Sequence, residues 1–256
     1  MRVSLIALTA LLSALLVLSL RGGAQTLQDL PPATSLTAAP AVAELFTSQS
    51  CSSCPPAEKL FADLAKRDDL IVLEWHVDYW DRLVHGRAGA WKDSYSNPDY
   101  TARQRQYNRA LRGTGGAYTP QAVINGVHET VGHQRQEIDR LVMTQSHAMA
   151  EIKTTAAANH VSVSIERFAT PLERPAYIYR LTLLPEQETA VPRGENRGVR
   201  LFSRNVVLDV ETVGTYTGDP QTLDIAQAEA GEACAVIVQE KRGNRLGPII
   251  GASYCP

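Results

Sequence analysis

Two cysteines separated by two residues, Cys51 and Cys54, are the side chains of this sequence best suited to chemistry. Thiols at this spacing can close a reversible disulfide, and a thiol at a helix N-terminus is activated by the helix dipole and the unpaired N–H groups. The motif therefore predicts Cys51 as an exposed nucleophile and Cys54 as a more buried resolving thiol. Two other interpretations stay open, namely half of a soft-metal site and an inert structural disulfide.

Three further side chains are candidate proton shuttles for a thiolate of this pair: His76, Asp78 and Glu44. His76 and Asp78 follow each other closely at the carboxyl end of an apolar run, and Glu44 lies in the run that precedes Cys51. An imidazole or a carboxyl group in such a place can exchange a proton with a thiol. The structural alternatives are equally open, because aspartates at strand ends often cap turns and a glutamate in a strand can face outward.

The two remaining cysteines, Cys234 and Cys255, are predicted to form a structural disulfide. Cys234 begins an apolar run, and a second run that ends at Cys255 can return beside it. Closing a loop of about 20 residues should stabilise the fold by about 3 kcal/mol.

The hydrophobic pattern predicts the elements that position the first cysteine pair. Strand-length apolar runs and helical periodicity alternate along the first half of the chain, with strands at 41–47, 70–76, 121–124 and 127–131 and helices at 57–66, 97–111 and from 132 to 149. The order is β-α-β-α-β-β-α, with the cysteine pair between the first strand and the first helix. This is the thioredoxin arrangement, so we expect an α/β thioredoxin-like domain over 41–150.

Thr119 and Pro120 stand directly before the third predicted strand and are the candidate substrate-docking residues. In thioredoxin-like folds a proline at this place is cis and faces the cysteine pair. The preceding backbone is then free to pair with an extended substrate chain. The alternative is an ordinary trans proline at a strand start, which sheets tolerate.

The second half of the chain has a different composition and hydrophobic pattern. Runs rich in Val, Ile and Thr are separated by turn-forming clusters and fall at 152–165, 176–184, 198–210 and 234–239. This pattern predicts a small all-β, sandwich-like domain over 151–256.

The first 24 residues resemble an export signal. Arg2 precedes an 18-residue run that is apolar apart from Ser and Thr, and small residues then offer a cleavage site after Ala24. We expect cleavage, a linker over 25–40 and a periplasmic or secreted bacterial protein, with membrane association only if the segment stays uncleaved. The chain carries 25 basic and 27 acidic residues, so it has no excess of positive charge that would favour binding to nucleic acid.

Several motifs, in the right order, make the sequence similar to a family of secreted bacterial proteins known as domain of unknown function 1223. The motifs lie at 44–56, 76–81, 91–93, 101–105, 118–121 and 125–126, with weaker ones at 193–196 and 205–207. The resemblance implies a thioredoxin-like domain with a C-terminal β extension, and it implies no substrate. Two features depart from the family pattern as we know it: an apparent insertion at 84–90, which would form a flap beside the site, and the pair Cys234 and Cys255.

These observations together predict an exported thiol–disulfide oxidoreductase that uses Cys51 and Cys54 on protein or small-molecule thiols and disulfides, with no cofactor, no metal and no nucleic-acid partner. Two alternatives remain. The first is a binding module in which the Cys51–Cys54 disulfide is structural. The second is a soft-metal carrier, against which a single C-x-x-C and only three methionines argue.

Overall fold

The computed structural model describes residues 39–83, 91–144 and 149–256. The predicted signal segment 1–24, nearly all of the predicted linker 25–40 and the insertion at 84–90 lie outside the described residues.

The described residues of the first half of the chain form four strands and four helices. They are β1 (Ala41–Thr47), α1 (Pro55–Leu64), β2 (Leu70–His76), α2 (Trp80–Leu83), α3 (Pro98–Leu111), β3 (Gln121–Ile124), β4 (His128–Val131) and α4 (Arg135–Met143). Local chemistry sets several of these limits. The Asn97 side chain accepts a hydrogen bond from the backbone N–H of Asp99 and caps α3, with Pro98 in the first turn. Asn125 and Gly126 both have positive φ and form the turn between β3 and β4.

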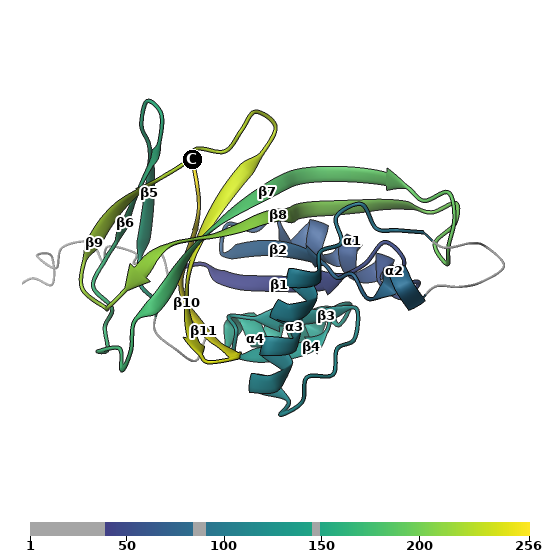
Figure 1. Cartoon of the computed structure of the whole chain (residues 1–256), viewed down its shortest axis with the longest axis horizontal. Helices are drawn as coiled ribbons and strands as arrows, with labels where there is room; N and C mark the ends of the chain where they lie inside the picture. The colour runs from purple at the N-terminus through teal and green to yellow at the C-terminus, as the bar shows by residue number, and fades with distance from the viewer. Residues whose placement is uncertain (1–38, 84–90, 145–148) are drawn as a thin grey trace, which may run out of the picture. The chain divides into compact units, whose positions relative to one another are not determined.

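The second half contributes only strands among the described residues. They are β5 (Ile152–Ala156), β6 (Val161–Ile165), β7 (Ala176–Ala190), β8 (Arg200–Tyr216), β9 (Gln221–Ile225), β10 (Ala233–Arg242) and β11 (Arg245–Tyr254). β7 and β8 are 15 and 17 residues long and pair along their whole length as an antiparallel ribbon (Figure 1). The ribbon is longer than the sequence pattern indicates, because its far ends carry polar residues that break the hydrophobic run.

The predicted fold, a thioredoxin-like α/β domain followed by a small all-β domain, is wrong. Strands from both halves share one mixed sheet of eight strands, in the order β11-β10-β7-β8-β2-β1-β3-β4. The connection is made where β8 runs parallel to β2, with Val206 opposite Glu74. Of the strands that the structure describes, the remaining three, β5, β6 and β9, form a separate sheet. The chain is therefore a predominantly β structure built around one large sheet.

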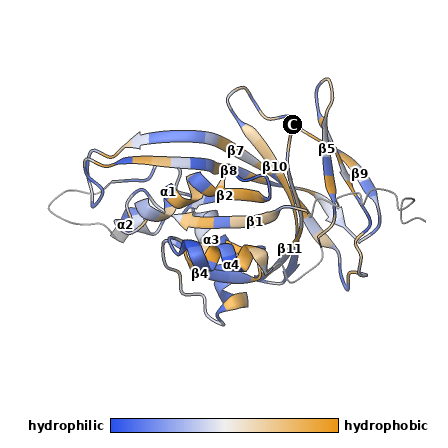
Figure 2. Cartoon of the chain, turned by 180° about the vertical axis from the view of Figure 1, so that it is seen from behind, coloured by the Kyte–Doolittle hydropathy of each residue, from blue (hydrophilic) through white to orange (hydrophobic). Residues whose placement is uncertain are grey.

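The burial of β2 shows why the two halves must combine. All seven residues of β2 are buried, including Glu74 and His76. In a sheet made from the first half alone, β2 would be an edge strand with unpaired N–H and C=O groups. β8 covers that edge, so β2 becomes an interior strand between β1 and β8. The strands near the centre of the sheet are rich in hydrophobic residues, whereas the far end of β7 is largely hydrophilic (Figure 2).

Candidate functional site

Cys51 and Cys54 form a disulfide in the turn between β1 and α1. The turn is tight, because the N–H of Cys51 donates to the Ser48 carbonyl at 3.0 Å and that of Cys54 donates to the Cys51 carbonyl at 3.1 Å. Cys54 is the N-cap residue of α1, so the regular helix begins only after the motif. Both cysteines have no exposed surface, whereas the two serines between them are exposed. The expectation that Cys51 is an exposed thiol is wrong for this oxidised form.

Thr119 lies directly against the disulfide, and the Thr119–Pro120 peptide bond is cis. The Thr119 hydroxyl donates a hydrogen bond to the sulfur of Cys51 at 3.2 Å. The same oxygen accepts a hydrogen bond from Nε1 of Trp80 in α2 at 2.6 Å. The threonine predicted from the sequence as a docking residue is thus in contact with the cysteine pair.

The turn between β7 and β8 covers the disulfide, and sequence reasoning did not place it there. Asn196 is buried, and its side-chain amide donates to the backbone carbonyls of Gln49 and Cys51, each at 2.9 Å. The Glu195 carboxylate accepts from the N–H of Ser52 at 3.3 Å. The one signal that could have identified these two residues is the weaker family motif at 193–196, which carries no information on where it lies in space.

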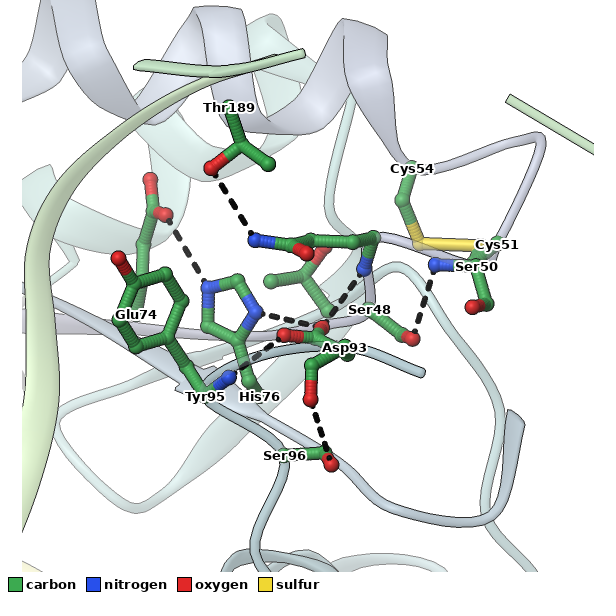
Figure 3. Close-up of polar contacts among 12 residues, drawn as sticks. Ser48, Ser50, Cys51, Cys54, Glu74, His76, Asp93, Tyr95, Ser96 and Thr189 are labelled. Atoms are coloured by element: carbon green, nitrogen blue, oxygen red, sulfur yellow. Dashed lines mark hydrogen bonds and ion pairs between the residues drawn. A yellow bond between two sulfur atoms is a disulfide. The ribbon is translucent and has the colours of Figure 1, made fainter. Parts of the chain in front are cut away.

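A buried ionic network lies beneath the turn that leads to Cys51 (Figure 3). Nδ1 of His76 is 2.7 Å from Oδ2 of Asp93, and both side chains are fully buried. The same Asp93 oxygen accepts from the N–H of Gln49, two residues before Cys51, at 2.7 Å. On the opposite side of the imidazole, Oε2 of Glu74 lies 3.9 Å from Nε2 of His76. His76 is therefore connected to the cysteine turn through Asp93, a residue that the sequence analysis included in a motif but did not assign a role.

A second buried glutamate, Glu58 in α1, belongs to the same electrostatic group. One of its oxygens accepts from the Thr47 hydroxyl at 2.7 Å, and the other has no hydrogen-bond partner. Neither Glu74 oxygen makes a hydrogen bond of good geometry, although Ser203 and the Arg204 backbone in β8 face it. Two carboxyl groups that are buried with so few partners favour their neutral form.

The pKa values of this group are shifted accordingly. Burial raises the pKa of Glu58 to about 7, against the attraction of His76 and the Thr47 hydrogen bond. Burial and the nearby Glu58 raise the pKa of Glu74 to about 8. Burial alone would lower the pKa of His76, but Asp93, Glu74 and Glu58 outweigh it and raise that pKa to about 9. Although burial acts to raise the pKa of Asp93, the charge and hydrogen bond of His76 hold it below the ordinary value.

The other two candidate shuttles lie in different surroundings. Glu44 in β1 is buried, but Arg103 and Tyr107 from α3 donate to its two oxygens. The two oxygens of Asp78 accept from Thr101 and Arg82. Each oxygen of these two carboxyl groups therefore has a hydrogen-bond partner, and the structure does not bring them into the network around His76.

Cys234 and Cys255 form the second disulfide, between β10 and the residue that follows β11. The N–H of Cys255 also donates to the Cys234 carbonyl at 2.8 Å, so the bridge extends the pairing of these neighbouring strands. Two disulfides in one chain fit an oxidising compartment.

Within the described ranges, no group of three or more His, Cys, Asp or Glu side chains has the arrangement of a metal site. The same part of the chain also holds no helix with the length and apolar character needed to cross a membrane.

Comparison with protein-family models identifies one family. The model of the family described as "Protein of unknown function (DUF1223)" matches residues 42–239. A crystal structure of a protein from Agrobacterium tumefaciens is similar at 31% identity, with a TM-score of 0.71, and the match covers 85% of this chain and 94% of that one. HBP35 of Porphyromonas gingivalis, at 13% identity and a TM-score of 0.58, is similar in fold over 85% of this chain and 74% of its own. The comparison with curated proteins gives no match. Because this family model matches most of the chain, and the motifs around the cysteine pair lie within the match, the chain belongs to the DUF1223 family.

Proposed function

We propose that this protein is an exported thiol–disulfide oxidoreductase in which the Cys51–Cys54 pair cycles between disulfide and dithiol. The observation that carries the proposal is the hydroxyl of Thr119, which donates to the Cys51 sulfur at 3.2 Å. A donor directed at one sulfur stabilises the thiolate that forms when the disulfide opens. Among the described residues, no hydrogen bond reaches a sulfur of the Cys234–Cys255 pair, so that pair serves as an internal comparison for an inert bridge.

Cys51 is the attacking sulfur in this proposal, and Cys54 is the resolving one. Pro55 and Pro56 occupy the first turn of α1 and lack N–H groups, which removes two of the donors that a helix N-terminus normally offers. The side-chain donor Thr119 therefore supplies stabilisation that backbone groups cannot supply here. A thiolate at Cys51 attacks a partner disulfide, and Cys54 then displaces the partner from the mixed disulfide.

The substrates would be protein or small-molecule thiols and disulfides outside the cytoplasm. The two disulfides support an oxidising compartment, and the export signal read from residues 1–24 supports the periplasm or the medium. Membrane association would then depend only on an uncleaved first segment.

Trapping of mixed disulfides tests this function. A Cys54→Ser variant expressed in the periplasm should accumulate covalent adducts that reductant releases, because the second step is blocked. A Cys51→Ser variant should accumulate none, and the Cys234→Ser, Cys255→Ser double variant, which leaves no unpaired thiol, is the control for loss of cysteines outside the site. If Cys54→Ser traps nothing and the wild-type protein does not exchange with a model disulfide, the oxidoreductase function is excluded.

The full burial of both cysteines favours a second candidate, a binding module with a structural disulfide. A measured reduction potential separates the two, because structural disulfides typically lie below about −300 mV. A value well above that limit supports exchange chemistry, and a value below it supports the binding module.

A further inference from the structure

Glu58 lies one helical turn after Cys54, on the face of α1 that meets β1 and β2. Its N–H donates to the Cys54 carbonyl at 3.1 Å, and residues four apart on a helix share a face. The Glu58 side chain is 1% exposed, and its Oε2 has no hydrogen-bond partner. A buried acid with a free oxygen is costly in any fold, so its presence beside a resolving cysteine calls for a physical reason.

The elements packed around Glu58 bring several polar and charged groups near its carboxyl. Thr47 of β1 donates to it, and the ionisable groups of β2 and of the segment before α3 face it electrostatically. These ionisable groups are Glu74, His76 and Asp93. Lys59 and Asp63 on α1 itself, and Arg200 at the start of β8, line the same groove as Glu58. The balance leaves Glu58 able to hold or release a proton near neutral pH.

We propose that Glu58 accepts the proton of Cys54 when this thiol resolves a mixed disulfide, and returns it when the pair is reduced. This inference rests on the oxidoreductase function proposed above. Glu58 was not among the candidate shuttles predicted from the sequence, and in this role it replaces Asp78 and Glu44. The oxygens of Asp78 already accept from Arg82 and Thr101. Those of Glu44 already accept from Arg103 and Tyr107.

The resolving step balances with the groups named. The Cys54 thiol gives its proton to the Glu58 carboxylate, and the resulting thiolate attacks the Cys51 sulfur. The Cys51–Cys54 bond forms as the bond between Cys51 and the partner sulfur breaks, and the partner leaves as a thiolate that takes a proton from water. Two electrons pass from the dithiol to the partner disulfide, and Glu58 retains one proton that must leave the interior.

A groove between α1 and β8 gives that proton a route to solvent. The groove has a volume of about 590 Å³, and Glu58 contributes to its lining together with Pro55, Pro56, Leu201 and the half-exposed Phe202. The carboxyl thus lies between the buried network around His76 and a cleft open to water. His76, Glu74 and Asp93 are positioning residues in this scheme, since they set the charge that Glu58 experiences.

The test is a two-step reaction of the full-length dithiol with one equivalent of 5,5′-dithiobis(2-nitrobenzoate). The first coloured thiolate reports attack by Cys51, and the second reports resolution by Cys54. In wild type the second step should rise with pH and level off once Glu58 is ionised, above about pH 7. In Glu58→Gln it should be slower at neutral pH by about tenfold or more and should keep rising with pH, because hydroxide must replace the carboxylate.

Two control variants separate the outcomes. Glu137→Gln, on the exposed ion pair of α4, should match wild type in both steps. Glu58→Asp keeps a carboxyl group at the position and should recover part of the rate of the second step. If Glu58→Gln were slow only because packing is lost, Glu58→Asp would show no such recovery. If the second step of Glu58→Gln stays within about threefold of wild type at every pH, this inference is overturned while the oxidoreductase function stands. If wild type fails at the first step, it is the proposed function that fails.

Discussion

The Thr119 hydroxyl bridges Trp80 and Cys51, accepting from the indole N–H at 2.6 Å and donating to the sulfur at 3.2 Å. A hydroxyl has one hydrogen, and the indole can only donate. The Thr119 hydrogen is therefore free to point at sulfur. This arrangement fixes a donor on the sulfur that we assign as the nucleophile.

Replacing Thr119 with valine should make the Cys51 thiolate less stable relative to the thiol, while the shape of the side chain at 119 stays the same. Loss of a hydrogen bond to a charged group costs about 1.5 kcal/mol, which reduces the thiolate fraction at neutral pH by about tenfold. The ultraviolet absorbance of the thiolate, followed against pH in the reduced protein, measures this fraction. Thr130→Val, whose hydroxyl donates to Gln134 on the surface, is the matched control and should behave as wild type. An unchanged titration in Thr119→Val would show that the contact has no role in activating Cys51.

Stability should fall as the pH rises from about 5 to 9. Glu58 and Glu74 have folded-state pKa values raised from 4.5 to about 7 and about 8, so between these limits the folded state binds more protons than the unfolded state. His76 acts in the same direction, because its pKa is raised from 6.5 to about 9 and its contribution is lost as the pH rises through that range. Asp93 opposes this only in acid, where its lowered pKa makes protonation destabilising.

The Glu58→Gln variant should remove part of that slope. An amide mimics the protonated carboxyl, so the variant avoids a cost on the order of 3 kcal/mol that wild type incurs when Glu58 ionises in the folded state. Urea unfolding at about pH 5 and about pH 8 gives the two free energies to be compared. Equal losses of stability in wild type and variant would contradict the raised pKa.

Asn196→Ala should loosen the cover over the disulfide. The substitution leaves the Gln49 carbonyl without its side-chain donor and leaves the Cys51 carbonyl with only the Cys54 N–H, at a cost of about 1–2 kcal/mol. Because both cysteines are buried beneath this turn, dithiothreitol should reduce the pair faster in the variant. Gln187→Ala, on the exposed part of β7, is the control for a change elsewhere on the same ribbon. A reduction rate equal to that of wild type would mean that the β7–β8 turn does not limit access.

Removal of the Cys234–Cys255 bridge should lower stability and leave the site unaffected. The bridge closes a loop with a sequence separation of 21, so a Cys234→Ser, Cys255→Ser double variant should lose about 3 kcal/mol. The rate at which the Cys51–Cys54 pair is reduced should stay the same, because the two disulfides share no hydrogen bond. Urea unfolding and the dithiothreitol rate provide the two measurements, and a changed rate would reveal coupling between the bridges.

The sequence by itself determined the local elements and the residues with chemical potential. Apolar periodicity, the Asn97–Pro98 helix start and the Asn125–Gly126 turn act over a few residues, so strands β1 to β3 and helix α3 lie where the pattern puts them. The Cys51–Cys54 motif and the Thr119–Pro120 pair were identified in the same way. Their proximity was expected only through the resemblance to a known arrangement.

Tertiary structure alone decided the sheet and the interior of the site. No local pattern predicts that β8 pairs with β2, or that Asn196 binds the backbone of Cys51, 145 residues away. Such contacts depend on which strand edges remain free after the local elements have formed. That one pairing converts β2 from an edge strand into an interior strand and buries Glu74 and His76. The burial then raises the pKa values of Glu58 and Glu74, since a charged carboxyl loses its hydration when β8 excludes water from that edge.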